Sequence, residues 1–404
     1  MNECGGRTAN NAEQQNARRQ MLVLAGIAVT FWFASAVGAF QSVYLQENGF
    51  SAAQYGVLSA ICSGVVVLAV SFWGVVSDRI GSLKKVLLLV MAVGFSSYAL
   101  VPAIPTALPC SVLLFTVLVP CIKVFHGPME PLAENLLVRD CAELRLDYGR
   151  IRGIASFSYA IGGIAATFLI ARTGVASTFC VSGLFGISCL ALLFRVRDAD
   201  NGFGRAKRLD AVNLRLLARN GRYLSFLVFY FLFYMAVNSR MSFLPYYMDA
   251  IGLASDRYGV VLAYDAFLEI PSLLLLGRLH SRFRYRQLVI LSVCLEMTEA
   301  VLLGTVCSSL LILVLCTTFY GLGNGIFIAS SLNYIYELAP VSLKASAQGF
   351  CSAAASVAGV LGNLLGGILF DRLGAKPFYL ALLLVYAASF AVLAFSEKKR
   401  AGGL

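Results

Sequence analysis

The sequence predicts an all-α membrane protein with about twelve transmembrane helices in two six-helix halves. Its composition is too apolar for a soluble domain, because 59% of the 404 residues are hydrophobic and 13% are charged, whereas soluble domains carry roughly 25% charged residues. Apolar stretches of about 20 residues, the length that crosses the hydrocarbon core of a bilayer, recur through the chain. These stretches are continuous rather than alternating, which indicates helices and not a barrel.

The expected spans follow one another with short polar breaks. They lie near residues 21–45, 54–76, 85–104, 110–138, 149–171, 176–195, 222–249, 257–280, 287–305, 308–337, 345–371 and 376–396. The first span is too long for a removable signal peptide and lacks a small-residue cleavage site. The expected layout is a cytoplasmic N-terminal tail over 1–20, a bundle over 21–195, a basic linker over 196–221, a bundle over 222–396 and a cytoplasmic tail over 397–404.

The basic residues concentrate in alternate loops, as the positive-inside rule describes for the cytoplasmic side of a membrane protein. They are Arg79, Lys84 and Lys85; Arg139, Arg145 and Arg150; Arg282, Arg284 and Arg286; those of the 196–221 linker; and Lys398, Lys399 and Arg400. This placement explains the net charge of +11 without a nucleic-acid partner. It predicts a multi-pass protein of the cell membrane with both termini in the cytoplasm.

Histidine and cysteine usage does not favour an enzyme that uses a metal. The chain has only two histidines, His126 and His280, and its 11 cysteines include no C-x-x-C pair. Most of the cysteines fall inside apolar spans, where they act as small hydrophobic residues. We therefore expect no enzyme activity, no cofactor and no metal site.

An internal repeat divides the chain into two similar parts. The segment YLQENGFSAAQYGV begins at Tyr44, and YMDAIGLASDRYGV begins at Tyr247, 203 residues later. Further on, GGIAATFLIARTG at 162–174 matches GNLLGGILFDRLG at 362–374. Duplicated helical halves are common in secondary transporters, whose substrate site lies between the repeats near the middle of the membrane.

The segment GVVSDRIGSLKK, residues 74–85, places a glycine, an acid, a base and a second glycine in a fixed order. It resembles the loop between helices 2 and 3 of the major facilitator superfamily. The resemblance implies a major facilitator fold and a gating motif composed of Gly74, Asp78, Arg79 and Gly81. Gly74 would let two helices approach closely, and Asp78 would face a helix N-terminus or a basic group in one state. The second-half copy, GRLHSRFRYR, has Ser281 in place of the acid, so we expect an asymmetric latch. A tight polar turn is the alternative interpretation.

The segment PLAENLLVRDCAELRLDYGRIRGIASFSY, residues 131–159, resembles helices 4 and 5 of the lactose permease and phenylpropionate permease group of proton symporters. Glu134 precedes Arg152 by eighteen residues, and Tyr159 follows Arg152 by seven, as in that group. The resemblance implies that these three residues bind the solute. A paired guanidinium and carboxylate offer directional hydrogen bonds, and each offsets the other's cost of burial. The alternative is a bridge from Glu134 to Arg152 or Arg150 without a ligand.

Five further charged residues fall inside predicted spans of the second half: Arg240, Asp265, Glu269, Glu296 and Glu299. Each costs roughly 2.5–3.5 kcal/mol at the centre of a bilayer, so we expect them to face the interior or one another. Asp265 and Glu269 are spaced i,i+4 and share a helix face. Two nearby carboxylates disfavour double ionisation, which predicts that one of them holds a proton.

The segment LEIPS, residues 268–272, resembles the helix 8 segment of the lactose permease group whose glutamate joins sugar binding to proton coupling, and Glu269 takes that position. The segment TTFYGLGNGIFIASS, residues 317–331, departs from the group because it lacks the histidine and glutamate of helix 10. The proton-coupling candidates are Glu269, Asp265 and Glu299, and the remaining charge network is Arg240 and Glu296. An interhelical salt-bridge network without a coupling role is the alternative.

The first functional hypothesis is a proton-coupled symporter, active as a monomer in the bilayer. It would import a small polar organic solute such as a sugar or glycoside, together with a proton, by alternating access. The second is a proton-linked exporter of drugs or metabolites, although the expected glycine-proline signature is missing from GIASFSYAIGGIAATF, residues 153–168. The third is a membrane sensor that moves no solute. It would need a soluble signalling part, and no loop exceeds about 26 residues.

Overall fold

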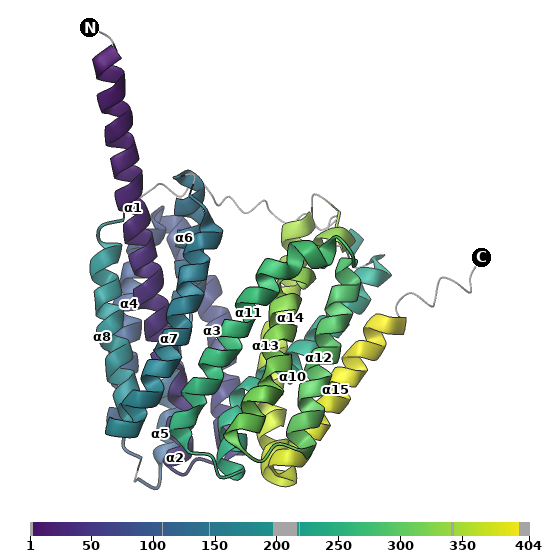
Figure 1. The fold of residues 1–404 in the computed structure, drawn as a ribbon. Helices are drawn as coiled ribbons and strands as arrows, with labels where there is room; N and C mark the ends of the chain where they lie inside the picture. Colours follow the sequence, from purple (N-terminus) through teal and green to yellow (C-terminus); the bar gives the residue numbers. More distant parts are fainter. Residues whose placement is uncertain are drawn as a thin grey trace, which may run out of the picture. The chain divides into compact units, whose positions relative to one another are not determined.

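The computed structural model describes residues 3–106, 108–144, 146–196, 216–217, 219–340 and 343–395. For residues 3–18, 273–278 and 345 it describes the backbone alone. Over these residues the chain forms helices and no strands (Figure 1). The predicted all-α fold is confirmed.

The helices of the first part of the chain are α1 (Glu3–Val37), α2 (Gln41–Glu47), α3 (Ala52–Ile80), α4 (Leu83–Ala99), α5 (Ser111–His126), α6 (Met129–Glu143), α7 (Tyr148–Thr173) and α8 (Ala176–Leu193). Those of the second part are α10 (Gly221–Ala250), α11 (Tyr258–His280), α12 (Tyr285–Thr305), α13 (Leu310–Leu338), α14 (Lys344–Leu373) and α15 (Ala375–Phe395). Short 3₁₀ turns lie at η1 (Gly38–Phe40), η2 (Val101–Ala103) and η3 (Ser255–Arg257).

These helices correspond closely to the predicted spans. Among the described residues, 11 helices are long and apolar enough to cross a membrane, and α11 coincides with the remaining predicted span, 257–280. The predicted span 110–138 is interrupted, because α5 ends at His126 and α6 begins after Pro128. Proline has no N–H to donate and therefore favours the first positions of a helix.

Two predicted segments cannot be compared in full. The helix α1 already begins at Glu3, within the segment expected to be a polar tail. The basic linker lies almost entirely outside the described residues, and so does the C-terminal tail. The proposed layout of two bundles, a linker and two tails stays a prediction.

The chain divides into two compact units. Unit 1 consists of residues 1–39, 68–105 and 121–205, and unit 2 of residues 40–67, 106–120 and 206–404. Each unit is therefore assembled from separate stretches of sequence. Unit 2 combines the first turns of α3 and α5 with the helices α10 to α15.

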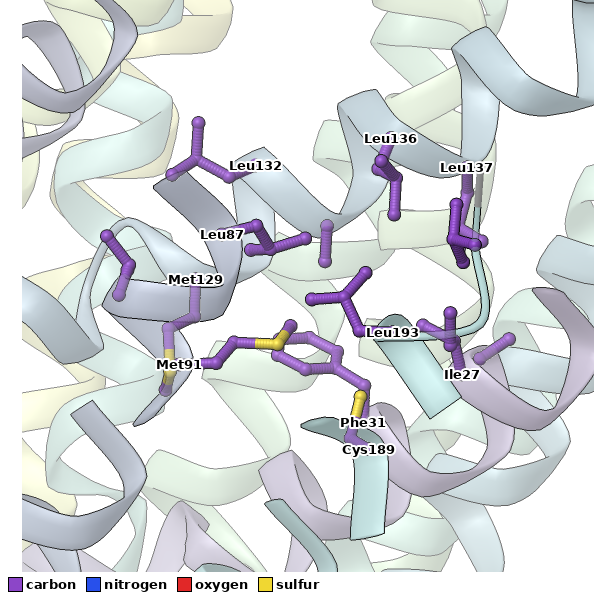
Figure 2. Packing of buried hydrophobic residues seen from close by; sticks show 14 of the residues in the cluster. Ile27, Phe31, Leu87, Met91, Met129, Leu132, Leu136, Leu137, Cys189 and Leu193 are labelled. Carbon is purple, nitrogen blue, oxygen red and sulfur yellow. The ribbon is translucent and has the colours of Figure 1, made fainter. Parts of the chain in front are cut away.

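Unit 1 is held together by a cluster of buried apolar side chains from α1, α3, α4, α6, α7 and α8. Figure 2 shows Phe31, Met91, Leu136 and Leu193 converging at its centre. Small residues let these helices approach closely, as is usual in membrane proteins. A Cβ atom at Gly162 of α7 would lie 2.9 Å from the Phe33 carbonyl oxygen of α1, so only glycine fits there.

In unit 2, glycines on α13 determine how near the neighbouring helices lie. A Cβ atom at Gly321 or Gly325 would lie 3.1 Å from the Asp265 carbonyl oxygen or 3.0 Å from that of Glu269, both on α11. On another side of α13, a Cβ atom at Gly323 would lie 3.2 Å from the Ser292 carbonyl oxygen of α12. These contacts bring the acidic segments of α11 and α12 against α13.

Candidate functional site

The side chain of Arg240 is the centre of a buried ionic cluster in unit 2. Its Nη1 atom lies 3.1 Å from Oδ2 of Asp265, and its Nη2 atom lies 2.7 Å from Oε1 of Glu299. The Nε atom also donates to Oε1 of Glu299, at 3.2 Å. The three side chains are at most 8% exposed. The expectation that these charges face one another therefore agrees with the geometry.

Two tyrosines that the sequence analysis did not single out complete this cluster. The ring of Tyr320 on α13 lies under the guanidinium, with 3.7 Å between the ring centroid and Cζ of Arg240. The hydroxyl of Tyr386 on α15 donates to Oε2 of Glu296 at 2.9 Å. Their positions inside apolar spans gave no sequence signal that separated them from other buried aromatic residues.

Glu269 has a hydrogen-bond partner of its own on α13. Its Oε1 atom accepts a hydrogen bond from Nδ2 of Asn324 on α13, at 2.7 Å. Glu269 is half-buried, whereas Asp265, one turn earlier on the same helix, is buried. The two acids thus have different polar partners, although their spacing suggested one shared proton site.

The predicted pairing of Glu134 and Arg152 is present in unit 1. Oε1 of Glu134 lies 3.3 Å from Nε of Arg152, and these side chains retain 32% and 40% of their surface exposed. Tyr148 donates its hydroxyl to the same Oε1 atom, and Nη1 of Arg152 donates to Oγ of Ser156 at 3.0 Å. Arg150 instead pairs with Asp147, where both side chains are exposed.

Arg152 also contacts a buried aromatic side chain of unit 1. The Trp32 ring lies 5.4 Å from Cζ of Arg152 and is 3% exposed, so it supports the guanidinium from the apolar side. Tyr159 is half-buried and packs against the apolar cluster of unit 1. Trp32, Tyr148 and Ser156 were not among the predicted site residues. Tyr148 and Ser156 each lie four residues from Arg152. This i,i+4 spacing places them beside Arg152 on one helix face and could have identified them from the sequence.

The predicted gating motif forms the end of α3 and the following turn. Gly81 has φ of 71°, a conformation that favours glycine, and Ser82 caps α4 by accepting from the Lys85 amide at 3.2 Å. Asp78 and Arg79 are exposed. A Cβ atom at Gly74 would meet no atom within 4 Å, so the close approach expected at Gly74 is not seen.

The sequence matches the model of a known protein family. The description of that model is MFS_1 like family, and it covers residues 26–381. The chain belongs to the MFS_1-like family. It is therefore a multi-pass membrane transporter of the major facilitator type, which confirms the resemblance drawn from the GVVSDRIG motif.

Several relatives extend this assignment along the chain. The MFS_1-like protein is 26% identical over 390 residues to the maltose permease of Geobacillus stearothermophilus, covering 96% of this chain and 97% of the permease. It is 23% identical over 349 residues to the putative nucleoside transporter YegT of Escherichia coli strain K12, covering 82% and 80%. The crystal structure of the nucleoside transporter NupG shares its fold, with a TM-score of 0.74, 16% identity and coverage of 94% and 98%.

Proposed function

We propose that this transporter imports a small hydroxylated solute, a sugar or glycoside, together with a proton, by alternating access across the cell membrane. The observation that carries the proposal is the half-exposed ion pair of Glu134 and Arg152 in membrane-spanning helices. An exposed ion pair contributes only about 0–1 kcal/mol to stability, whereas charges within the bilayer are costly. A role in binding explains why such a pair is present in these helices.

The arginine is suited to bind hydroxyl groups. A guanidinium has five N–H donors in a fixed planar arrangement, and its bonds to Glu134 and Ser156 use one on Nε and one on Nη1. The remaining donors and the second oxygen of Glu134 offer both bonding directions that a sugar hydroxyl requires. Tyr148 and Trp32 hold the pair in one orientation, which lowers the entropy cost of binding.

The names of the relatives favour a solute that contains a sugar ring. One relative is a maltose permease, and others are named as nucleoside transporters. Maltose and nucleosides share a ring with several hydroxyl groups, although only nucleosides carry a base. We therefore propose that the hydroxylated ring binds at Arg152. The remainder of the solute, a second sugar or a base, would contact other residues of the site.

The proposed proton coupling rests on the charge balance in unit 2. Asp265, Glu296 and Glu299 contribute three buried carboxyl groups, and among the described residues Arg240 is the basic side chain that bonds two of them, Asp265 and Glu299. If all were ionised, the buried cluster would carry a net negative charge in a low-dielectric environment, which is unfavourable. Protonation of one carboxyl group relieves this cost, and Glu269 offers a half-buried carboxylate for contact with solute.

The proposal includes an orientation of the chain in the membrane. The basic loops lie on the cytoplasmic side, and both termini are cytoplasmic. One chain carries every residue of the proposed sites, and we propose that the transporter acts as a monomer.

Uptake experiments test the proposal in cells that express the transporter. Radiolabelled maltose and uridine serve as probes, and the pH of a weakly buffered medium is recorded during uptake. We expect one probe to accumulate while the medium becomes alkaline. The Glu269→Gln variant loses a carboxylate that we expect to contact the solute, so it should accumulate less solute, and alkalinisation should fall in proportion.

The matched control for Glu269→Gln is Glu337→Gln, because Glu337 is an exposed acid on α13. This variant should accumulate solute and take up protons like the parent protein. Solute entry without any proton movement in the parent protein would contradict the symport proposal. Protection of the cells from cationic dyes without uptake of either probe would favour an exporter instead.

A further inference from the structure

Glu296 is a buried acid with only half of its carboxyl group hydrogen-bonded. The residue is 0% exposed. Its Oε2 atom accepts the hydroxyl of Tyr386 at 2.9 Å, whereas its Oε1 atom has no hydrogen-bond partner among the described residues. The hydroxyl of Ser292, one turn earlier on α12, is also buried and unpartnered there. An ionised carboxylate in this position would keep one oxygen without compensation, which is costly in a buried site.

The neighbouring charges make ionisation of Glu296 still less favourable. The titratable and charged groups around it are Arg240 and Tyr234 on α10, Asp265 on α11, Glu299 on α12, Tyr320 on α13 and Tyr386 on α15. Among the described residues around Glu296 the one cation is Arg240, which already bonds Asp265 and Glu299. A third negative charge at Glu296 would have no cation left to pair with.

We propose that Glu296 carries the coupling proton, which it holds on Oε1 as a neutral carboxylic acid in this state. The inference rests on the proposed proton symport and assigns its proton to Glu296, which was not among the proton-coupling candidates Glu269, Asp265 and Glu299. The O–H bond forms with a proton from water on one side of the membrane. It breaks with release of the proton to water on the other side, and no other reactant is needed. Tyr386 is a positioning residue that donates to Oε2 in both forms.

Infrared difference spectroscopy of the purified, solute-free transporter tests this assignment directly. A protonated carboxylic acid has a carbonyl stretching band that disappears when the acid ionises. We expect such a band at neutral pH, and we expect it to be absent in Glu296→Gln. The Tyr386→Phe variant should keep the band but shift it to higher wavenumber, because one hydrogen bond to the carbonyl oxygen is lost. Glu337→Gln is the matched control and should leave the band unchanged.

The outcomes separate this assignment from the proposed function. If the band persists in Glu296→Gln and is lost in Glu299→Gln or Asp265→Asn, the proton belongs to the Arg240 pairs and the assignment is overturned. If Glu296→Gln cannot be purified, Tyr386→Phe provides the test: an unshifted band in this variant also overturns the assignment of the proton to Glu296. In vesicles, Glu296→Gln should retain solute exchange but lose accumulation driven by a pH gradient. If the band is lost in Glu296→Gln but the parent transporter moves no proton, Glu296 is protonated as proposed and the symport proposal is contradicted.

A second inference comes from a different contact in unit 2. Both oxygens of Asp371 on α14 accept backbone amides at the start of α3, from Ala52 at 3.0 Å and from Ala53 at 2.9 Å. These amides belong to the first turn of α3, where the N–H groups have no partner within the helix. Next to this contact, a Cβ atom at Gly56 would lie 3.1 Å from Cα of Gly367. The carboxylate also faces the positive end of the helix dipole.

The segment that holds Asp371 repeats the pattern of the gating motif. Residues 367–374 read GILFDRLG and residues 74–81 read GVVSDRIG, so both have glycine, three residues, Asp-Arg, one residue and glycine. The copy on α14 is engaged with α3, whereas Asp78 of the copy on α3 is exposed. We infer that Asp371 is a latch that keeps the start of α3 on α14 and must release when this end of unit 2 opens.

The native Cys62 is a suitable reporter for this latch. It is 6% exposed, and the neighbouring Ser63 accepts a hydrogen bond from Nδ2 of Asn363 on α14. In a variant that keeps Cys62 as its single cysteine, a bulky maleimide should label Asp371→Asn at least severalfold faster than the parent. Asp78→Asn is the matched control and should not accelerate labelling. A labelling rate unchanged by Asp371→Asn, whether or not the melting temperature falls, would show that the contact is no latch.

Discussion

The ionic groups of the two units differ in exposure and in charge balance. In unit 1, one carboxylate faces one guanidinium, and each keeps about a third or more of its side chain exposed. In unit 2, one guanidinium faces two carboxylates, a third acid lies beside them, and all are buried. The first group has free hydrogen-bonding capacity that can meet a ligand. The second can gain only a proton, because larger partners have no access.

In the proposed mechanism, the exposed pair of unit 1 binds solute and the buried cluster of unit 2 carries the proton. A pair near solvent contributes little to stability and can change partners at low cost. A buried pair is strongly destabilising to break, because the remaining charge has no solvation. We therefore expect substitutions at Glu134 and Arg152 to act on solute binding and substitutions in the Arg240 cluster to act on folding and protonation.

The largest expected effect is that of Arg240→Met, which leaves Asp265 and Glu299 buried without a cation. Breaking a buried pair in this way costs about 3–5 kcal/mol. The melting temperature of the purified transporter should fall markedly. In the matched variant, Asp265→Asn and Glu299→Gln are added to Arg240→Met, and most of the stability should return because no charge is left unpaired. An unchanged melting temperature in Arg240→Met would remove the contrast between the units.

The next effect is the loss of solute affinity in Arg152→Ala. Hydrogen bonds to a charged group contribute about 1.5–3 kcal/mol, so affinity should fall about 10- to 100-fold. Stability should change by less than about 1 kcal/mol, because the pair is exposed. Calorimetry with whichever of maltose or uridine is transported measures the affinity. Arg152→Lys keeps the charge but loses the planar arrangement of donors, and it should fall between the parent and Arg152→Ala. Parent-like binding by Arg152→Ala would place the solute elsewhere.

The smallest effect is expected for Ser156→Ala. The serine hydroxyl orients Nη1 of Arg152, and one such hydrogen bond contributes about 0.5–1.5 kcal/mol. Solute affinity should therefore fall about two- to tenfold in the same calorimetric assay. Ser177→Ala is the control, since Ser177 bonds Thr173 at the exposed end of α7. An equal loss in both variants would mean that the effect does not act through Arg152.

Much of the site was predictable from charged residues in apolar segments. Because charges are costly in the bilayer, Arg240, Asp265 and Glu299 had to meet one another or the interior, and they do. The eighteen-residue spacing from Glu134 to Arg152 also predicted a pair that is present. The pairing of Glu269 with Asn324 and of Glu296 with Tyr386 was not predictable. Both partners lie on other helices, and the sequence does not specify which residues of different helices meet.

The sequence alone determined the membrane class, the approximate positions of most helices and the family, although it missed the early start of α1 and the break between α5 and α6. Lipid offers no hydrogen bonds to the backbone, so every crossing segment must be a continuous apolar helix, and this requirement is visible in a single chain. The tertiary structure decided which acids share Arg240, which acid lacks a cation and where glycine brings α11 and α12 against α13. These features depend on distances of a few ångströms between different helices, and spacing along one helix does not encode them.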